Sequence, residues 1–250
     1  MIHRPSQNST FKIGGKAVLA IPSNDWGNLE SPWISVDMDI WNILIQERPR
    51  VRYPANHDIF WQDKPHSNIY IVAKGRVCIS ILHSDGQQKH LYIACSGAMI
   101  GETACILSQP YETTATAITE TELYCIPSRE VQRLFHSEAY LADWLLQYEA
   151  RKNRLLISQV AMLSFEKAPQ RIAKILLCLC ENYGKKTNSG IYISIRFTCT
   201  ELAAIANTSR VTSNNTILSF IHDGILAKSK SHYVVKGIEQ LREIATLVQE

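Results

Sequence analysis

Several sequence patterns that mark common classes of protein are missing from this chain of 250 residues. It has no run of about 18 apolar residues, and its N-terminal segment lacks the apolar core of a secretion signal. We therefore expect no membrane span and a cytoplasmic location. A Walker loop, a Gly-x-Ser-x-Gly motif and a His-x-His pair are also absent, which argues against an enzyme. We predict no catalytic residue, no metal ligand and no bound cofactor.

Cysteine is present, but not in paired spacing. The seven cysteines are an odd number, occur mostly in apolar segments and form no Cys-x-x-Cys pair. Cys178 and Cys180 lie two apart on an expected helix and therefore point to different faces, which disfavours a metal site. We expect reduced, buried thiols with packing roles; a redox response of a thiol pair is the alternative.

Positive charge is concentrated in the last third of the chain. The net charge is +3, but residues 167–250 hold 11 Lys and Arg against 6 Asp and Glu, whereas residues 1–166 hold 15 against 17. A basic C-terminal region favours contact with a phosphate backbone.

Residues 198–226 predict two short helices joined by a tight turn. Thr198 and Glu201 have the spacing of a capping box, Asn207 tolerates a left-handed turn, and Ser209 is suited to cap the second helix. The outer face of that helix presents guanidinium, amide and methyl groups suited to the major groove. The residues that we expect at DNA are Thr198, Ser209, Arg210, Val211, Thr212, Asn214 and Asn215. An ordinary helical subdomain is the alternative.

Two strands around a basic tip follow these helices. Gly224 ends the second helix, Ile225 and Leu226 begin a strand, and residues 233–235 form another after the tip at 228–232. Such a strand pair is typical of a wing. We predict that residues 167–250 form a winged-helix DNA-binding domain that opens with a helix near 171–183.

The middle of the chain changes from strands to one long helix. Strand-like runs at 59–61, 69–72, 77–82, 91–93 and 123–126, with an Asp85-Gly86 hairpin signal, predict a closed antiparallel β domain over residues 50–136. The next segment, residues 137–166, is predicted to be a dimerisation helix, which we expect to be helical over 137–165. Apolar residues with 4,3 spacing are Leu141, Leu145, Tyr148, Leu155 and Met162, interrupted by Lys152 and Gln159 and flanked by Leu146, Leu156, Val160 and Leu163. This stripe is broad enough for the β domain and for a second copy of the helix, so we predict a homodimer; a helix buried inside one monomer is the alternative.

Residues 1–49 look like an N-terminal arm. Turn signals such as Gly14-Gly15 and Ser31-Pro32 surround Trp26 and Trp33, and residues 37–46 suit a short helix. We expect the two tryptophans to cover apolar surface of the next domain.

The motifs from residue 50 to about 238 resemble, in order, those of the Crp/Fnr family of bacterial transcription regulators. The segments Ile69–Ile81, Asp85-Gly86 and Ser96–Thr103 are similar to its cyclic-nucleotide-binding β-roll, and Gln170–Leu177 and Thr198–Thr212 to its winged helix. The resemblance implies an α+β protein with an N-terminal β-roll, a long dimerisation helix and a C-terminal winged helix-turn-helix. It also implies two partners, which are double-stranded DNA that contains an inverted repeat and RNA polymerase. We expect no contact with a membrane.

The expected effector pocket departs from that of the members that bind cyclic AMP. The Gly101-Glu102 pair is present, but Thr113-Thr114-Ala115 stands where those members have Arg-Ser-Ala, and a neutral hydroxyl binds phosphate more weakly than a guanidinium. Leu156 and Ile157 stand where a hydroxyl pair contacts adenine, so we expect an apolar pocket. Its residues are Gly101, Glu102, Thr103, Thr113, Thr114 and Leu156.

The resemblance therefore implies control by a small, less charged organic effector rather than by cyclic AMP. A cyclic-nucleotide-responsive regulator is one alternative, and an effector-independent regulator or protein-docking module is another. An iron–sulfur centre is disfavoured because the first cysteine is Cys78, and haem because the loop at Ala98-Met99-Ile100 contains no Cys or His. The sequence leaves open the effector, the target genes and whether transcription is activated or repressed.

Overall fold

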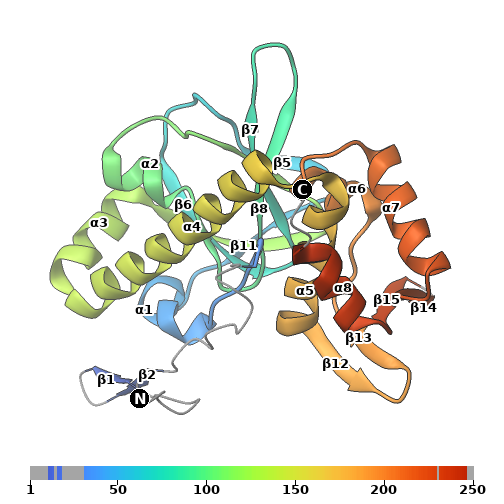
Figure 1. The fold of residues 1–250 in the computed structure, drawn as a ribbon. Helices are drawn as coiled ribbons and strands as arrows, with labels where there is room; N and C mark the ends of the chain where they lie inside the picture. The colour runs from blue at the N-terminus through green and yellow to red at the C-terminus, as the bar shows by residue number, and fades with distance from the viewer. Residues whose placement is uncertain (1–10, 14–15, 19–30, 230, 247–250) are drawn as a thin grey trace, which may run out of the picture.

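The computed structural model describes residues 11–13, 16–18, 31–229 and 231–246 of the chain. Within them, a β-rich unit is followed by the long helix α4 (Ala139–Phe165) and a smaller C-terminal unit. In Figure 1, α4 crosses the front of the β-rich unit toward the C-terminal unit, which is drawn in orange and red. Trp26 and the Gly14-Gly15 turn lie outside the described residues.

Two sheets form the β-rich unit, which we call the sensor. The larger has five strands and the smaller four, and their pairings are antiparallel except where β3 joins β8. In spatial order the larger contains β3 (Trp33–Ile34), β8 (Gln88–Ala94), β7 (Val77–Leu82), β10 (Thr114–Ala117) and β5 (His57–Phe60). The smaller contains β4 (Arg50–Tyr53), β11 (Thr121–Pro127), β6 (Asn68–Lys74) and β9 (Met99–Ile100). The predicted antiparallel β domain is confirmed, including the β7–β8 hairpin, where Gly86 has φ +88°.

Helices cover the sensor, and one of them was not predicted. The short helix α2 (Glu102–Leu107) follows β9, and the unpredicted α3 (Ser128–Ser137) follows β11. The predicted long helix is confirmed as α4, but it starts at Ala139 rather than at residue 137: α3 ends there, and Glu138, with φ −119° and ψ 87°, separates the two helices. The break lets α3 pack on the sensor strands through the fully buried Val131, while α4 runs in another direction.

The C-terminal unit contains the predicted winged helix-turn-helix. The helix α5 (Ala168–Tyr183) opens it, and α6 (Cys199–Ile205) and α7 (Arg210–His222) form the helix pair. Its four-stranded sheet has the spatial order β12 (Gly184–Thr187), β13 (Gly190–Ile193), β15 (His232–Val235) and β14 (Leu226–Ser229), and α8 (Ile238–Thr246) follows. The wing strands β14 and β15 are confirmed, whereas β12 and β13 were not predicted.

The N-terminal segment packs on the sensor, as expected, and also on the C-terminal unit, which was not expected. β1 (Phe11–Ile13) and β2 (Lys16–Val18) pair with each other, and the predicted short helix is η1 (Met38–Trp41) followed by α1 (Asn42–Ile45). Trp33 is 2% exposed, and its ring lies 6.3 Å from that of Phe197 in the C-terminal unit. Trp33, Ile93 and Cys95 share one hydrophobic cluster with residues of α5, α6 and α7, so the sensor and the C-terminal unit have a common apolar core.

Candidate DNA interface and effector site

The helix α6 begins with the predicted capping box. The Thr198 hydroxyl accepts from Glu201 N at 3.0 Å, and Glu201 Oε2 accepts from Thr198 N at 2.7 Å. Asn207 has φ 49°, which confirms the left-handed turn, and the Ser209 hydroxyl accepts from Thr212 N at 2.9 Å. The caps fix where both helices start and thus the direction of α7.

The helix α7 buries one face and exposes the other. Ile217 and Phe220 are buried, as predicted, and pack in the core of the C-terminal unit. The exposed residues include Arg210, Val211, Asn214 and Asn215, with Val211 69% exposed. The Thr212 hydroxyl lies 2.9 Å from that of Ser209, so both residues also serve the cap. α7 therefore presents an exposed face of guanidinium, amide and methyl groups, the groups that read base edges in a major groove.

The predicted effector residues begin at a turn that only glycine suits well. Gly101 has φ +80°, and a Cβ there would lie 3.0 Å from Tyr111 Cε1. The next residue, Glu102, starts α2 and is 1% exposed. A buried carboxylate needs a partner, and the structure supplies one that the sequence did not indicate.

That partner is Lys152 of α4. Its ammonium is ion-paired with Glu102 and lies 3.3 Å from Glu149 Oε1, and the residue is 7% exposed. It also lies over the rings of Tyr92 and Tyr148, at 5.7 and 5.6 Å from their centroids. The expected apolar pocket is therefore wrong: this region contains two carboxylates and one buried cation.

The Lys152 cluster has perturbed proton affinities. Burial alone would lower the pKa of Lys152, but attraction by Glu102 and neighbouring groups raises it well above its ordinary value. Burial and the Glu102 carboxylate raise the pKa of Glu149 to about 7. The Tyr148 hydroxyl donates to Met99 O at 2.7 Å, so α4 is attached to the sensor at two neighbouring positions.

The other predicted effector residues are only partly gathered around Glu102. Thr103 follows it on α2, and Leu156 is half-buried against the sensor core. Thr113 is half-buried. Thr114 accepts from Gln62 N at 3.1 Å and lines a separate hollow of about 570 Å³ between the larger sheet and α6. Ala115, its neighbour on β10, packs instead in the core beside α4.

The apolar stripe of α4 is divided between two faces. All seven residues of the predicted 4,3 series are buried inside the monomer, including the polar interruptions Lys152 and Gln159. A second 4,3 series is exposed, with Leu146, Ile157 and Val160 at 71%, 60% and 64%. Its members are Leu146, Ala150, Asn153, Ile157 and Val160, which we call the α4 seam. Exposed apolar residues with coiled-coil spacing suit pairing with another helix.

The last features of the described parts of the chain concern disulfides, metal sites and membrane-spanning helices. None of the seven cysteines, all of which lie in the described residues, forms a disulfide, and burial raises the pKa of Cys78 to about 12 and that of Cys180 to about 12. Among residues 11–13, 16–18, 31–229 and 231–246, no group of three His, Cys, Asp or Glu side chains is placed to hold a metal ion. No helix in those ranges is long and apolar enough to cross a membrane.

Comparisons with known proteins match both units. Residues 50–138 match the cyclic nucleotide-binding domain, and residues 170–244 match the Crp-like helix-turn-helix domain. The chain is 26% identical over 198 residues to a CRP-like cAMP-activated global transcriptional regulator of Mycobacterium tuberculosis, covering 79% of this chain and 88% of the relative. It is 29% identical over 193 residues to the cyclic AMP receptor protein of Thermus thermophilus, covering 77% and 86%.

Solved structures have the same architecture. A CooA mutant from Carboxydothermus hydrogenoformans matches with a TM-score of 0.74 at 19% identity, covering 84% of this chain and 95% of that one. The regulator CLP of Xanthomonas campestris matches with a TM-score of 0.66 at 24% identity, covering 80% and 100%. With both domain types in the expected order, the chain belongs to the Crp/Fnr family of non-enzymatic, DNA-binding transcription regulators, with an effector-binding domain before the helix-turn-helix.

Proposed function

We propose that the protein is a homodimeric transcription regulator that reads an inverted repeat with the α7 helices of both subunits. The exposed α4 seam carries this proposal, because pairing two such helices sets the spacing between two recognition helices. Half-sites about one helical turn apart suit that geometry. We divide the chain into an arm at 1–49, which adds β3 to the sensor sheet, an effector-binding domain at 50–136, a dimerisation segment at 137–166 that contains α4, and a DNA-binding domain at 167–250. RNA polymerase is the further partner.

Arg210 is the first candidate for reading a base. It stands at the start of α7 and is exposed, and arginine forms bidentate hydrogen bonds with guanine. Val211 beside it offers a methyl surface for thymine. Asn214 and Asn215 add amides to the same exposed face, while Thr198, Ser209 and Thr212 are suited to phosphates.

The effector is a small organic molecule without a phosphate. The Lys152 cluster supports this choice, because Glu102 already neutralises its one cation, and Glu149, with its pKa raised to about 7, adds partial negative charge, so no positive charge is left for an anionic ligand. The segment from Thr103 to Thr114 supplies no further cation and contains Glu112. The molecule would bind near Gly101, Glu102, Thr103, Thr113 and Leu156; Thr114 would contribute through its backbone.

A cyclic-nucleotide-responsive regulator is the second candidate, because the Mycobacterium and Thermus relatives carry cyclic AMP in their names. Other relatives point elsewhere: a solved structure of CprK is a complex with OCPA, and CLP is described as c-di-GMP responsive. Proteins with this fold therefore differ in effector, so the choice between effectors depends on the residues of the pocket. An effector-independent regulator is the third candidate, since Lys152 and Tyr148 attach α4 to the sensor without a ligand.

Two measurements test the proposal. Selection of duplexes from a random pool with the purified protein should enrich an inverted repeat; enrichment of single half-sites by a monomer would contradict it. Calorimetry with cyclic AMP, cyclic GMP, c-di-GMP and a panel of small aromatic and organic acids then tests the pocket. Micromolar binding of a cyclic nucleotide to the wild-type protein would overturn the choice of effector. High operator affinity with no ligand from the panel would favour the third candidate.

A further inference from the structure

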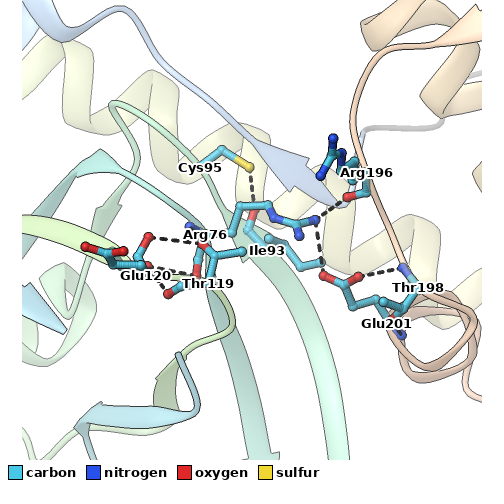
Figure 2. A network of polar contacts seen from close by, with 9 residues as sticks. Arg76, Ile93, Cys95, Thr119, Glu120, Arg196, Thr198 and Glu201 are labelled. Carbon is cyan, nitrogen blue, oxygen red and sulfur yellow. Dashed lines mark hydrogen bonds and ion pairs between the residues drawn. The ribbon is translucent and has the colours of Figure 1, made fainter. Parts of the chain in front are cut away.

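Two cations of the sensor contact the two ends of α6, the helix that supports the recognition helix. Arg76 Nη1 lies 3.1 Å from Glu201 Oε1 at the start of α6 and donates to Arg196 O at 2.6 Å just before it. Lys89 of β8 donates to Ala204 O and Ile205 O at the other end, at 3.4 and 3.2 Å. We call these contacts of Arg76 and Lys89 the α6 clamp. Figure 2 shows Arg76 reaching from the sensor to Arg196 and Glu201.

The contacts suit the electrostatics of a helix. The carbonyls at the C-terminal end of a helix carry partial negative charge and lack partners within it, so a cation there is favourable. At the other end Glu201 has two roles, because Oε2 caps the helix through Thr198 N while Oε1 receives Arg76. One carboxylate thus joins the cap of α6 to the sensor, and with side chains 18% and 13% exposed the pair is shielded from water.

The sensor holds Arg76 rigidly. Gly75 before it has φ +93°, and a Cβ there would lie 2.5 Å from Glu120 O. Arg76 N donates to Thr119 Oγ1 at 2.9 Å, and Arg76 O accepts from Ile118 N at 2.9 Å. The guanidinium therefore projects from a fixed backbone in the turn between β6 and β7, which is hydrogen-bonded to the turn between β10 and β11; Figure 2 shows Thr119 and Glu120 of that second turn beside Arg76.

The helix α6 passes this restraint to α7. The two helices pack together and are joined by a turn of few residues, so they move as one body. The clamp leaves the reading face free, since Arg210, Val211, Asn214 and Asn215 are exposed. It therefore orients the recognition helix without covering it.

We propose that Arg76 and Lys89 are positioning residues for DNA reading, which hold α6 so that α7 has a fixed orientation relative to the α4 seam. This inference rests on the proposed function, because a fixed orientation matters for a dimer that must fit two half-sites at once. Without the clamp, each helix pair can still bind phosphates independently of its partner subunit, so non-specific binding is little affected. Specific binding must then fix the orientation of both helix pairs, and the entropy lost in doing so weakens it. Loss of the clamp thus lowers specific affinity more than non-specific affinity.

The test uses the full-length protein and a duplex selected by it from a random pool. Glu201→Gln removes the charge but keeps an acceptor for the α6 cap, and Arg76→Gln removes the other partner. Each should lower specific affinity about tenfold and change binding to a random duplex less than about twofold. The double variant should be no weaker than either single one, because both remove one interaction. Arg76→Lys should recover most of the loss, and Lys89→Met should cause a smaller one.

The control is Arg129→Gln, an exposed arginine of α3 on the side of the sensor away from α6 in Figure 1. Unchanged specific affinity in Arg76→Gln and Glu201→Gln, or additive losses in the double variant, would overturn the inference. A rise in specific affinity would show that the clamp restrains α7 in a non-binding orientation and would overturn it as well.

Calorimetric unfolding separates failure of the clamp from failure of the proposed function. The two units share the apolar core around Trp33, so wild type and variants should unfold in one transition. Arg76→Gln and Glu201→Gln should each lower its midpoint by a similar amount that the double variant does not increase, whether or not any duplex is selected. A midpoint unchanged in both variants would mean that the pair does not couple the two units. Failure to select a duplex, with the midpoint lowered in this way, would instead reject the proposed function.

Discussion

The helix-turn-helix and the effector pocket differ in how far apart their key residues lie along the chain. Thr198 and Glu201, which cap α6, are three residues apart, and Ser209 and Thr212 at the next cap are equally close. In the pocket, Glu102 and Lys152 meet although 50 residues separate them. Short-range hydrogen bonds can be read from the spacing of residue types, whereas a contact between two elements depends on how those elements pack.

The two regions also differ in the role of their polar residues. In α7, exposed polar residues mark a surface that is free to bind. In α4, Lys152 and Gln159 interrupt an apolar series because the sensor supplies them with partners: Glu102 for the lysine and Leu91 O for the glutamine. A polar residue in a buried stripe therefore indicates a buried partner elsewhere; the interrupted 4,3 pattern carried that signal, but the sequence-based prediction did not connect it to the pocket.

The largest effect is expected from breaking the buried pair. Lys152→Met removes the cation that pairs with the carboxylate of Glu102, a residue that is only 1% exposed. The unpaired buried charge should lower the free energy of unfolding, measured by urea denaturation, by about 3–5 kcal/mol. Adding Glu102→Gln removes the unpaired charge and should restore at least half of the loss. A cost below about 1 kcal/mol for Lys152→Met would show that the pocket is open to water and is no constraint on α4.

The next largest effect concerns the exposed face of α4. Replacing Leu146 and Val160 together by Glu should give a folded monomer, because both side chains are exposed, and should lower operator affinity at least about a hundredfold through loss of bivalent binding. Sedimentation equilibrium and fluorescence anisotropy measure both. The matched pair Leu145→Glu and Leu155→Glu changes side chains that are 9% and 2% exposed, and should unfold the sensor instead. A dimer that survives the first pair would exclude the α4 seam as its interface.

A smaller effect is expected at the reading face. Arg210→Ala should cost about 1–3 kcal/mol on the selected duplex and relax the preference for guanine at one position. Lys228→Ala in the wing is the comparison, since a phosphate contact should weaken binding to all sequences alike and reduce the salt dependence by about one charge. If Arg210→Ala behaves like Lys228→Ala, then Arg210 binds phosphate rather than a base.

The elements that the sequence predicted correctly carry their own local signals. The caps of α6 and α7, the turn at Asn207, the wing and the β7–β8 hairpin all depend on residues within a few positions of one another. The break at Glu138 has no glycine or proline to mark it and results from the packing of α3 on the sensor. The β12–β13 hairpin did have a signal, since Gly190 with φ +127° ends its turn, but the segment was not interpreted as a hairpin.

The smallest effect is a pH dependence that belongs to the pocket and has no counterpart in the helix-turn-helix. The pKa of Glu149 is raised to about 7 in the folded protein, above about 4.3 in an unfolded chain. Its proton therefore binds the folded state more tightly, so the stability from this group is complete below pH 4 and is lost as the pH rises to about 7. Glu149→Gln imitates the protonated form and should be more stable than wild type by about 1 kcal/mol at pH 8, a value reduced for solvent screening, with no difference near pH 4.5. Urea denaturation across this range measures it, and Glu112→Gln in an exposed loop is the control. Parallel stability curves for wild type and Glu149→Gln would mean that Glu149 is ionised throughout, and that the cluster carries a full negative charge whenever an effector approaches.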